Sequence, residues 1–384
     1  MAVEGPRGAR TEEVAAAAEL ASSVFWSGKG ISMGDHFPLL FHKDNAEDLR
    51  VFVDEGRPVS LVGMLQRGIW LLGTRHRCGC IGSVCTGPDY RGQGLATRLV
   101  HDARAKALHD GADILLISGS RSLYTRQGYA RVGGYATCAV TRKQLPERGD
   151  YTVRRWKPED VPALVRLRTA EPVRFARTPE DFQALLGVSC VAKTSGDTRV
   201  ICVKRGAPVA YVSCKRPGSH RVEKDETRIE EMAGSRWAIA RSLGRLFDEF
   251  KVERIKVNYL DCDTEVAELA RRFGWSSEPL PFGGTVGIIE PERFWQACAP
   301  LFEERLGRET FAALDFRVDG EAVTLALGDE TLALDNMAEF TRLVFLPARQ
   351  RGELELGLGP ESELGRALDQ IFPMPLVAYG LNFV

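Results

Sequence analysis

An arginine and two glycines stand directly before a stretch with helical periodicity in the first half of the chain. Arg91, Gly92 and Gly94 precede apolar residues spaced four apart, so a helix is expected to begin near Gly94. Backbone N–H groups in the first turn of a helix have no intrahelical partner and lie at the positive end of the helix dipole. Glycine lets a bulky anion approach the backbone, while Arg91 adds a cation and Thr97 a hydroxyl. The pattern predicts a cradle for a pyrophosphate.

Two other phosphate-binding motifs do not fit this stretch. A Walker motif requires Gly-Lys-Ser/Thr after its second glycine, whereas Gly94 is followed by Leu-Ala. A dinucleotide fingerprint requires a third glycine inside a strand–helix–strand unit, and that glycine is absent. Both alternatives therefore fail, and the anion cradle remains.

Alternating apolar residues on either side of the cradle predict a mixed sheet flanked by helices. A helix with an Ala-rich and Val-containing stripe is expected over 12–26. The helix after the cradle is expected to end near Gly111. The order of strands, helix and strand favours a mixed sheet with the cradle where a strand passes into a helix. Strands are expected over 49–53, 59–64, 69–72, 80–86 and 113–118.

The cradle and its neighbours resemble the GNAT superfamily of acetyl-coenzyme A-dependent N-acetyltransferases. Residues 91–96, Arg-Gly-Gln-Gly-Leu-Ala, match the Arg/Gln-x-x-Gly-x-Gly/Ala motif of that family, and the motif over 123–129 follows at the expected spacing. The resemblance implies that the loop amides hold the pyrophosphate of acetyl-coenzyme A. It also implies that the preceding strand splays from its neighbour and binds the pantetheine arm and the acetyl carbonyl. The residues assigned in this way are Val84, Cys85 and Thr86 on the strand, and Arg91, Gly92, Gln93, Gly94, Leu95, Ala96 and Thr97 on the loop.

The layout of the whole chain resembles the enhanced-intracellular-survival type of this superfamily. That resemblance implies an α+β fold with tandem GNAT folds and a sterol-carrier-like α+β unit, whose end inserts into the first active site. The implied units are a catalytic GNAT domain at 1–148, a degenerate GNAT-like domain at 149–290 and a sterol-carrier-like domain at 291–384.

The second unit repeats the first as a weak internal repeat. A hairpin over 200–212, a helix over 236–250 and a strand over 254–258 follow the order of the first half. At the place equivalent to the cradle stand Glu230 and Glu231, and an anion site would not be built with two acids. The second unit is therefore not expected to bind coenzyme A.

Acetyl transfer to an amine needs a deprotonated amine, a hydrogen-bond donor for the developing oxyanion and a proton for the departing thiolate. Tyr124 lies where the family places its general acid, and a phenol with a pKa near ~10 keeps its proton at neutral pH. For the general base, the resemblance points to the C-terminal carboxylate of Val384, with His36 as the alternative. Asp35, His36 and Phe383 are the candidate contacts to the acceptor.

Two other chemistries are considered and set aside. His76, Cys78 and Cys80 alternate along an apparent strand with no fourth ligand nearby, so no metal site is expected. Cys85 has no histidine or acid placed by sequence to activate it as a nucleophile, so direct transfer is expected. A non-catalytic function stays open, in which the protein senses acyl-coenzyme A or binds a lipid through its last unit.

The composition limits the partners. A net charge of −1 with 44% hydrophobic and 27% charged residues calls for neither a nucleic acid nor a membrane. Nine scattered cysteines fit reduced thiols in a cytoplasmic protein better than a disulfide framework. The expected acceptor is a primary amine on a small cationic molecule, such as an aminoglycoside or a polyamine, or on a lysine side chain. From the resemblance we expect a homo-oligomer, a hexamer in relatives of this layout.

Overall fold

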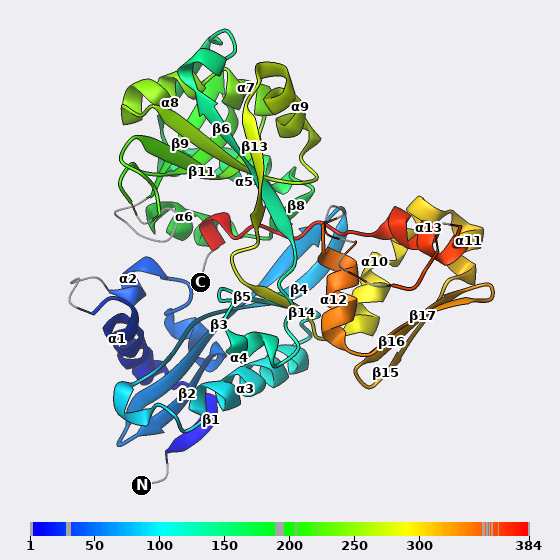
Figure 1. Cartoon of the computed structure of the whole chain (residues 1–384). Helices are drawn as coiled ribbons and strands as arrows, with labels where there is room; N and C mark the ends of the chain where they lie inside the picture. The colour runs from blue at the N-terminus through cyan, green and yellow to red at the C-terminus, as the bar shows by residue number, and fades with distance from the viewer. Residues whose placement is uncertain are drawn as a thin grey trace.

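The computed structural model of the chain contains three β-sheets, each covered by its own helices (Figure 1). This arrangement confirms the expected mixed α+β class. The structure describes residues 3–27, 32–188, 196–203, 206–219, 221–347, 350, 352, 354, 356–359 and 361–382.

The first sheet has seven strands, and all neighbours pair antiparallel except β4 and β5. β3 is one long strand, where the sequence suggested two, and β4 begins before the expected residue 80. The strands in spatial order are β1 (Glu4–Gly8), β2 (Leu49–Asp54), β3 (Arg57–Leu71), β4 (Thr74–Thr86), β5 (Ile114–Ile117) and β14 (Thr285–Ile288), with β8 (Val173–Phe175) pairing the far end of β3.

Alternation along β3 decides which helix covers which face of this sheet. Leu61 and Leu65 face α1 (Val14–Phe25) and α2 (Met33–His36), whereas Val62 and Met64 face α3 (Leu95–His109) on the opposite side. The stripe predicted for α3 is confirmed, because its apolar residues at four-residue spacing are all buried. A short helix α4 (Ser122–Thr125) follows β5.

The second sheet repeats the pairing pattern of the first. β11 and β12 form its parallel pair, as β4 and β5 do in the first sheet. The helix expected over 236–250 is interrupted at Arg241 and Ser242. The strands in spatial order are β13 (Ser276–Pro281), β6 (Gly134–Thr141), β12 (Arg254–Leu260), β11 (Glu226–Gly234), β10 (Pro208–Lys215), β9 (Gly196–Val203) and β7 (Tyr151–Arg155). The helices are α5 (Val161–Thr169) and α6 (Pro179–Val188) on one face, and α7 (Arg236–Ala240), α8 (Leu243–Phe250) and α9 (Thr264–Phe273) on the other.

The two large sheets exchange strands. β6 precedes the expected boundary at 148 yet pairs with β12 and β13 in the second sheet. β14 precedes the expected boundary at 290 yet pairs with β5 in the first sheet. β8 lies between β7 and β9 in the chain yet pairs with β3 in the first sheet. Among the described strands the polypeptide therefore crosses between the two sheets four times, and the boundaries at 148 and 290 stay predictions that strand pairing does not follow.

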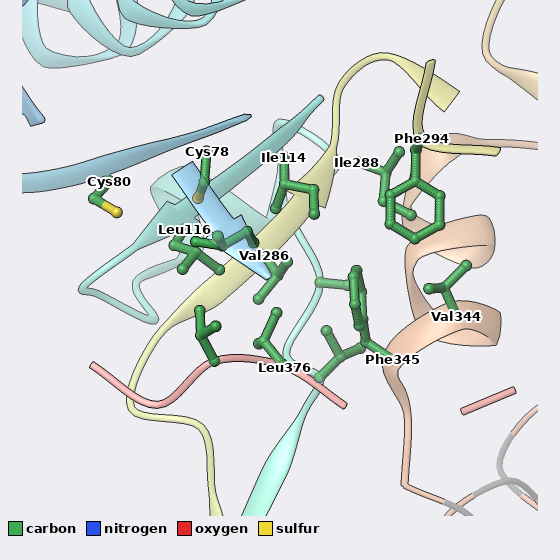
Figure 2. Close-up of a cluster of buried hydrophobic side chains, with 14 of the residues drawn as sticks. Cys78, Cys80, Ile114, Leu116, Val286, Ile288, Phe294, Val344, Phe345 and Leu376 are labelled. Carbon is green, nitrogen blue, oxygen red and sulfur yellow. The ribbon is translucent and has the colours of Figure 1, made fainter. Parts of the chain in front are cut away.

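The last part of the chain packs on the first sheet. It holds a three-stranded antiparallel sheet, β15 (Asp315–Asp319), β16 (Ala322–Leu327) and β17 (Glu330–Leu334), with helices α10 (Pro291–Leu306), α11 (Arg308–Ala313), α12 (Met337–Phe345) and α13 (Glu363–Ile371). Figure 2 shows how buried side chains from β4, β5 and β14 meet those of α10, α12 and the strand-like segment after α13. These residues are Cys78, Cys80, Ile114, Leu116, Val286 and Ile288 on the sheet, and Phe294, Val344, Phe345 and Leu376 opposite.

The C-terminal segment after α13 runs between the two large sheets toward α6 (red in Figure 1). Leu376 packs against Gly133, and Tyr379 stacks on Phe282 with ring centroids 5.0 Å apart. The segment ends in a 3-10 turn, Gly380–Asn382, which lies against α6 and β11. Among the described helices, none combines the length and hydropathy that crossing a membrane requires.

Candidate active site

The predicted cradle forms the connection between β4 and α3. Gly92 and Gly94 have φ angles of +78° and +71°, a left-handed conformation that glycine adopts without strain. The first backbone hydrogen bond of α3 runs from Arg98 N–H to the carbonyl of Gly94, at 3.1 Å. Within the described part of the chain, the N–H groups of residues 95–97 have no hydrogen-bond partner. These donors are the ones that an anion at the start of α3 would take up.

The space outside this connection fits a bound diphosphate. A Cβ built on Gly92 or Gly94 meets nothing within 4 Å, so open space lies against the bare backbone. Gln93 is exposed, whereas Leu95 is buried and anchors the first turn of α3 in the core. Ala96 and Thr97 are half-buried. The predicted loop residues are therefore brought together, and their contribution comes mainly from the backbone.

Arg91 ties this loop to the last residue of β4. Its Nε donates a 3.2 Å hydrogen bond to the carbonyl oxygen of Thr86, and its side chain is exposed. The guanidinium is thus fixed at the edge of the open space, where it supplies the cation expected from the sequence.

β4 separates from β5 at its C-terminal end, as the resemblance implied. The parallel pairing runs only from Cys78 to Ile81, and Ser118 N–H donates the last bond to the carbonyl of Ile81 at 2.9 Å. Two residues later Ser83 has a φ of +52°, and the register with β3 shifts there. Such a bulge bends one strand away from its neighbour and leaves backbone groups unpaired. Residues 84–86 therefore line the opening on the side away from β3.

The side chains at this opening do not supply a nucleophile. Val84 and Thr86 are half-buried, and Thr86 Oγ1 lies 2.8 Å from Ser60 Oγ on β3. Burial raises the pKa of Cys85 to about 12, against a small opposing effect of Arg91. A thiol with that pKa is protonated at neutral pH, which agrees with the expected direct transfer.

Tyr124 lies beside the same opening. Gly119 directly follows the last β4–β5 hydrogen bond, and a Cβ built on it would meet the Tyr124 ring at 2.7 Å and its hydroxyl at 3.5 Å. Glycine at 119 therefore lets the phenol lie over the end of β5. Burial raises the pKa of Tyr124 above its ordinary value, with Arg121 opposing. The phenol stays protonated at neutral pH, as a general acid requires.

The two early residues named as acceptor contacts differ in environment. Asp35 is exposed in the first turn of α2, whereas His36 is only 7% exposed. His36 Nδ1 lies 2.9 Å from the carbonyl oxygen of Ser32, and its ring packs edge-on against Trp26. Its Nε2 is buried with no hydrogen-bond partner among the described residues.

The end of the C-terminal segment is held by a buried ion pair. Arg177 bonds both oxygens of Glu231 at 2.7 Å, and its Nε donates a 2.6 Å bond to Asn382 Oδ1. The N–H of Leu381 donates to Glu231 Oε2 at 3.0 Å, and Tyr211 Oη donates to Oε1 at 2.7 Å. Both charged side chains are at most 3% exposed. Of the remaining predicted site residues, Phe383 and Val384 lie outside the described residues.

Comparison with known families agrees with this geometry. The family model for the acetyltransferase (GNAT) domain matches residues 6–132. Residues 6–132 are a GNAT acetyltransferase domain. The chain is thus an enzyme of the acetyltransferase class, and GNAT enzymes use acyl-coenzyme A to acylate amines. No curated protein sequence matches the chain.

Solved structures similar to the chain share its fold along nearly the whole length. A probable N-acyltransferase from Enterococcus faecalis is 14% identical, with a TM-score of 0.68 over 97% of this chain and 98% of that one. A GCN5-related N-acetyltransferase from Anabaena variabilis is 14% identical, with a TM-score of 0.63 over 95% and 96%. Eis1 from Mycobacterium abscessus is 15% identical, with a TM-score of 0.60 over 96% and 95%. At these identities the likeness establishes the fold alone.

The connection after β11 in the second sheet differs from the cradle of the GNAT domain. A single residue, Ser235, separates β11 from α7. The N–H of Gly234 donates to Glu171 Oε1 at 2.9 Å, and Arg236 donates to both oxygens of Glu171 at 2.9 and 2.5 Å. A carboxylate of the chain itself therefore already accepts from the Gly234 amide and the Arg236 guanidinium at this connection, and Ser235 Oγ accepts from the N–H of Ala238.

The prediction that Glu230 and Glu231 stand at the cradle-equivalent place is wrong. Both lie inside β11, where Glu230 faces Lys215 and Glu231 faces Arg177. Glu230 and Glu231 were assigned to a loop from the internal repeat, because the sequence before α7 is polar. Sequence reasoning also missed Arg177 and Tyr211 as partners of Glu231, since no local signal connects residues so far apart.

The residues considered for a metal site form a structural cluster. His76 Nδ1 lies 2.6 Å from Asp113 Oδ2, and its ring stacks on Phe294 at 4.9 Å. Cys78 and Cys80 point into the buried contact with the C-terminal part (Figure 2). Within the described ranges, no three His, Cys, Asp or Glu side chains are grouped to hold a metal ion.

Proposed function

We propose that the chain transfers an acetyl group from acetyl-coenzyme A to a primary amine. The observation that supports this best is the position of bare first-turn amides of α3 next to the unpaired end of β4. The bare amides of α3 suit a pyrophosphate, and the unpaired backbone at the end of β4 suits an extended amide-bearing arm. These two features lie one short loop apart.

Each predicted residue then has a role. The amides over 91–97 and the Arg91 guanidinium hold the pyrophosphate, and the backbone of Val84–Thr86 aligns the arm. Bound acetyl-coenzyme A supplies an activated thioester. An N–H near Cys85 donates to the acetyl oxygen, and Tyr124 holds a proton for the departing sulfur.

For the general base we retain the carboxylate of Val384, with His36 as the alternative. Support comes from the segment just before it, because Leu381 and Asn382 are fixed beside His36 in one pocket. Phe383 and Asp35 remain proposed acceptor contacts.

We also propose that the layout is of the enhanced-intracellular-survival type. In that scheme the unit over 149–290 is a second GNAT-like domain that binds no coenzyme A, and 291–384 is a sterol-carrier-like domain. The Glu171 carboxylate at the start of α7 supports the first assignment. Assembly as a homo-oligomer, a hexamer in relatives of this layout, stays a prediction.

Thiol release from acetyl-coenzyme A with a panel of amines tests the function directly. We expect release that depends on the amine and is lost when Tyr124 is replaced by Phe. Tight coenzyme binding without release for any amine would favour a non-catalytic sensor of acyl-coenzyme A instead.

A further inference from the structure

A pocket lies where α2, α6 and the C-terminal segment meet. Its wall is apolar and includes Leu40, Leu65, Leu185 and Leu381. Among the described residues that line it, only His36 and Asn382 are polar. The pocket therefore draws on the first sheet through Leu65, on α6 through Leu185 and on the end of the C-terminal segment through Leu381.

His36 presents a hydrogen-bond acceptor to this pocket. Its Nδ1 lies 2.9 Å from the Ser32 carbonyl, which can only accept, so Nδ1 carries the proton of the neutral ring. Nε2 is then the acceptor nitrogen, and it is buried with no partner in the described part of the protein. The imidazole cannot turn away freely because it packs on Trp26 with ring centroids 5.0 Å apart.

Asn382 presents a donor to the same pocket. Its Oδ1 accepts the bond from Arg177, which fixes the orientation of the amide. Nδ2 is left buried without a partner among the described residues, in a side chain 3% exposed. Arg177 is itself held by Glu231, so the donor belongs to a rigid set of groups.

Two unpaired polar atoms in one apolar pocket indicate a ligand. A buried polar atom without a hydrogen-bond partner is unfavourable, and a ligand with a matching donor and acceptor removes that cost. The described lining holds no carboxylate, and the nearby Glu231 is fully engaged by Arg177. A polycation would find no opposite charge there.

The pocket adjoins the opening in the GNAT domain. Two methyl carbons of Leu40 lie 3.1 and 3.2 Å from the position of a Cβ on Gly63, and the carbonyl of Gly82 lies 3.2 Å from the same point. Gly82 pairs with Gly63 directly before the bulge at Ser83. A molecule in the pocket is thus next to the strand that splays from β5.

We propose that this pocket binds the acceptor, and that the acceptor is an apolar amine with a neighbouring oxygen rather than a polycation. The amine N–H donates to His36 Nε2, the oxygen accepts from Asn382 Nδ2, and the apolar body fills the leucine-lined wall. This inference rests on the proposed function, which it narrows to one substrate class.

Leucinamide, 3-methylbutylamine and spermidine are suitable probes for kcat/KM with acetyl-coenzyme A. Leucinamide has the amine, the oxygen and the apolar body. 3-Methylbutylamine lacks the oxygen, and spermidine is a polycation. We expect leucinamide to exceed spermidine by about 10²-fold, with 3-methylbutylamine between them. Equal or better efficiency with spermidine would overturn the inference.

Isosteric variants test the two polar atoms. His36→Phe keeps the ring against Trp26 and removes the acceptor, and Asn382→Asp keeps the oxygen facing Arg177 and removes the donor. Each should lower kcat/KM for leucinamide by about 10-fold or more and leave the Kd for acetyl-coenzyme A unchanged. His42→Phe is the matched control, because His42 is half-exposed and contacts Asp44 within its own turn. Unchanged kcat/KM in both pocket variants would overturn the assignment.

Nitrogen NMR of 15N-histidine-labelled protein separates this inference from the proposed function. Leucinamide should shift one imidazole Nε2 resonance that is missing in His36→Phe. A shift without thiol release for any amine refutes the acetyl transfer and leaves the binding pocket standing. Thiol release without any shift, which is expected if the pocket holds only water, refutes the pocket and leaves the transfer standing.

Discussion

The Nε of Arg177 donates a 2.6 Å hydrogen bond to Oδ1 of Asn382, 205 positions further along the chain. The other two nitrogens of the same guanidinium engage Glu231 on β11. One buried side chain thus links the start of α6, the second sheet and the C-terminal segment. Since Asn382 also lines the pocket between α2, α6 and the C-terminal segment, the second unit fixes one residue of that pocket.

Replacing Glu231 by Gln should destabilise the protein strongly. The substitution leaves Arg177 charged and buried without its partner, which typically costs about 3–5 kcal/mol of the free energy of unfolding. Urea unfolding followed by circular dichroism measures this. Glu268→Gln is the control, because its partner Arg271 lies on the surface and both side chains are mostly exposed. Equal stability of the two variants would contradict the role of the buried pair.

The same pair predicts how stability depends on pH. Burial alone would raise the pKa of Glu231, but the charges of Arg177 and Arg168 outweigh it and hold the pKa well below its usual range. An unfolded chain binds that proton near pH ~4.3 and the folded one does not. The stabilisation is therefore full above about pH 5 and is lost as the pH falls toward the folded value. As the pH is lowered from about 6 to about 3, the free energy of unfolding should fall less steeply for Glu231→Gln than for the wild-type protein.

Replacing both Gly92 and Gly94 by Val should abolish tight coenzyme binding. Both positions have positive φ, which a β-branched residue adopts only with strain, and the new side chains would fill the space against the bare amides. We expect the Kd for acetyl-coenzyme A, measured by calorimetry, to rise by about 10²-fold or more. Gly320→Val is the control. Gly320 also has a positive φ, in the hairpin between β15 and β16, and its replacement should leave the Kd for acetyl-coenzyme A unchanged.

Tyr124→Phe should lower kcat by about 10²–10⁴-fold and leave the KM for acetyl-coenzyme A near its original value. Because burial raises the pKa of Tyr124 above its ordinary value, the alkaline loss of the wild-type kcat should come at a higher pH than a solvent-exposed phenol would give. Tyr129→Phe is the control, since its hydroxyl is buried with no partner among the described residues and burial raises its pKa to about 12. Full activity of Tyr124→Phe would remove it as the acid.

Calorimetry should find one acetyl-coenzyme A per chain. In the described residues the paired glycines and open loop before α3 have no counterpart at α7, where Glu171 accepts from the N–H of Gly234 and from Arg236, and Ser235 Oγ accepts from the N–H of Ala238. Two molecules of acetyl-coenzyme A per chain would show that a phosphate displaces the Glu171 carboxylate from its donors.

The cradle was predictable because its chemistry is local. Glycines before an amphipathic helix specify a left-handed turn and bare amides within a few residues, and the structure places Gly92 and Gly94 in that conformation. Tyr124 was named from the resemblance, whose motif over 123–129 keeps a fixed spacing from the strand before it, and its role as the general acid stays a prediction.

The contacts of Arg177 with Glu231 and Asn382, and the pocket beside them, were not predictable because they depend on long-range packing. In the sequence, His36 is an isolated histidine in an expected loop, with no signal that connects it to Asn382. The fold brings the two residues into the lining of one pocket. Glu231 was noticed as an acid and given the wrong place, since a buried ion pair leaves no periodic trace in the sequence. Strand exchange escaped prediction too, because an apolar strand such as β14 suits either sheet.

The exchange of β6 and β14 sets an order for synthesis. The edge of β5 stays uncovered until Ile288 has left the ribosome, although the catalytic loop was made almost 200 residues earlier. A nascent chain that stops after residue 148 would carry an open, apolar sheet edge, which is prone to aggregation. The first sheet can therefore be completed only after the strands of the second sheet that precede β14 have been translated.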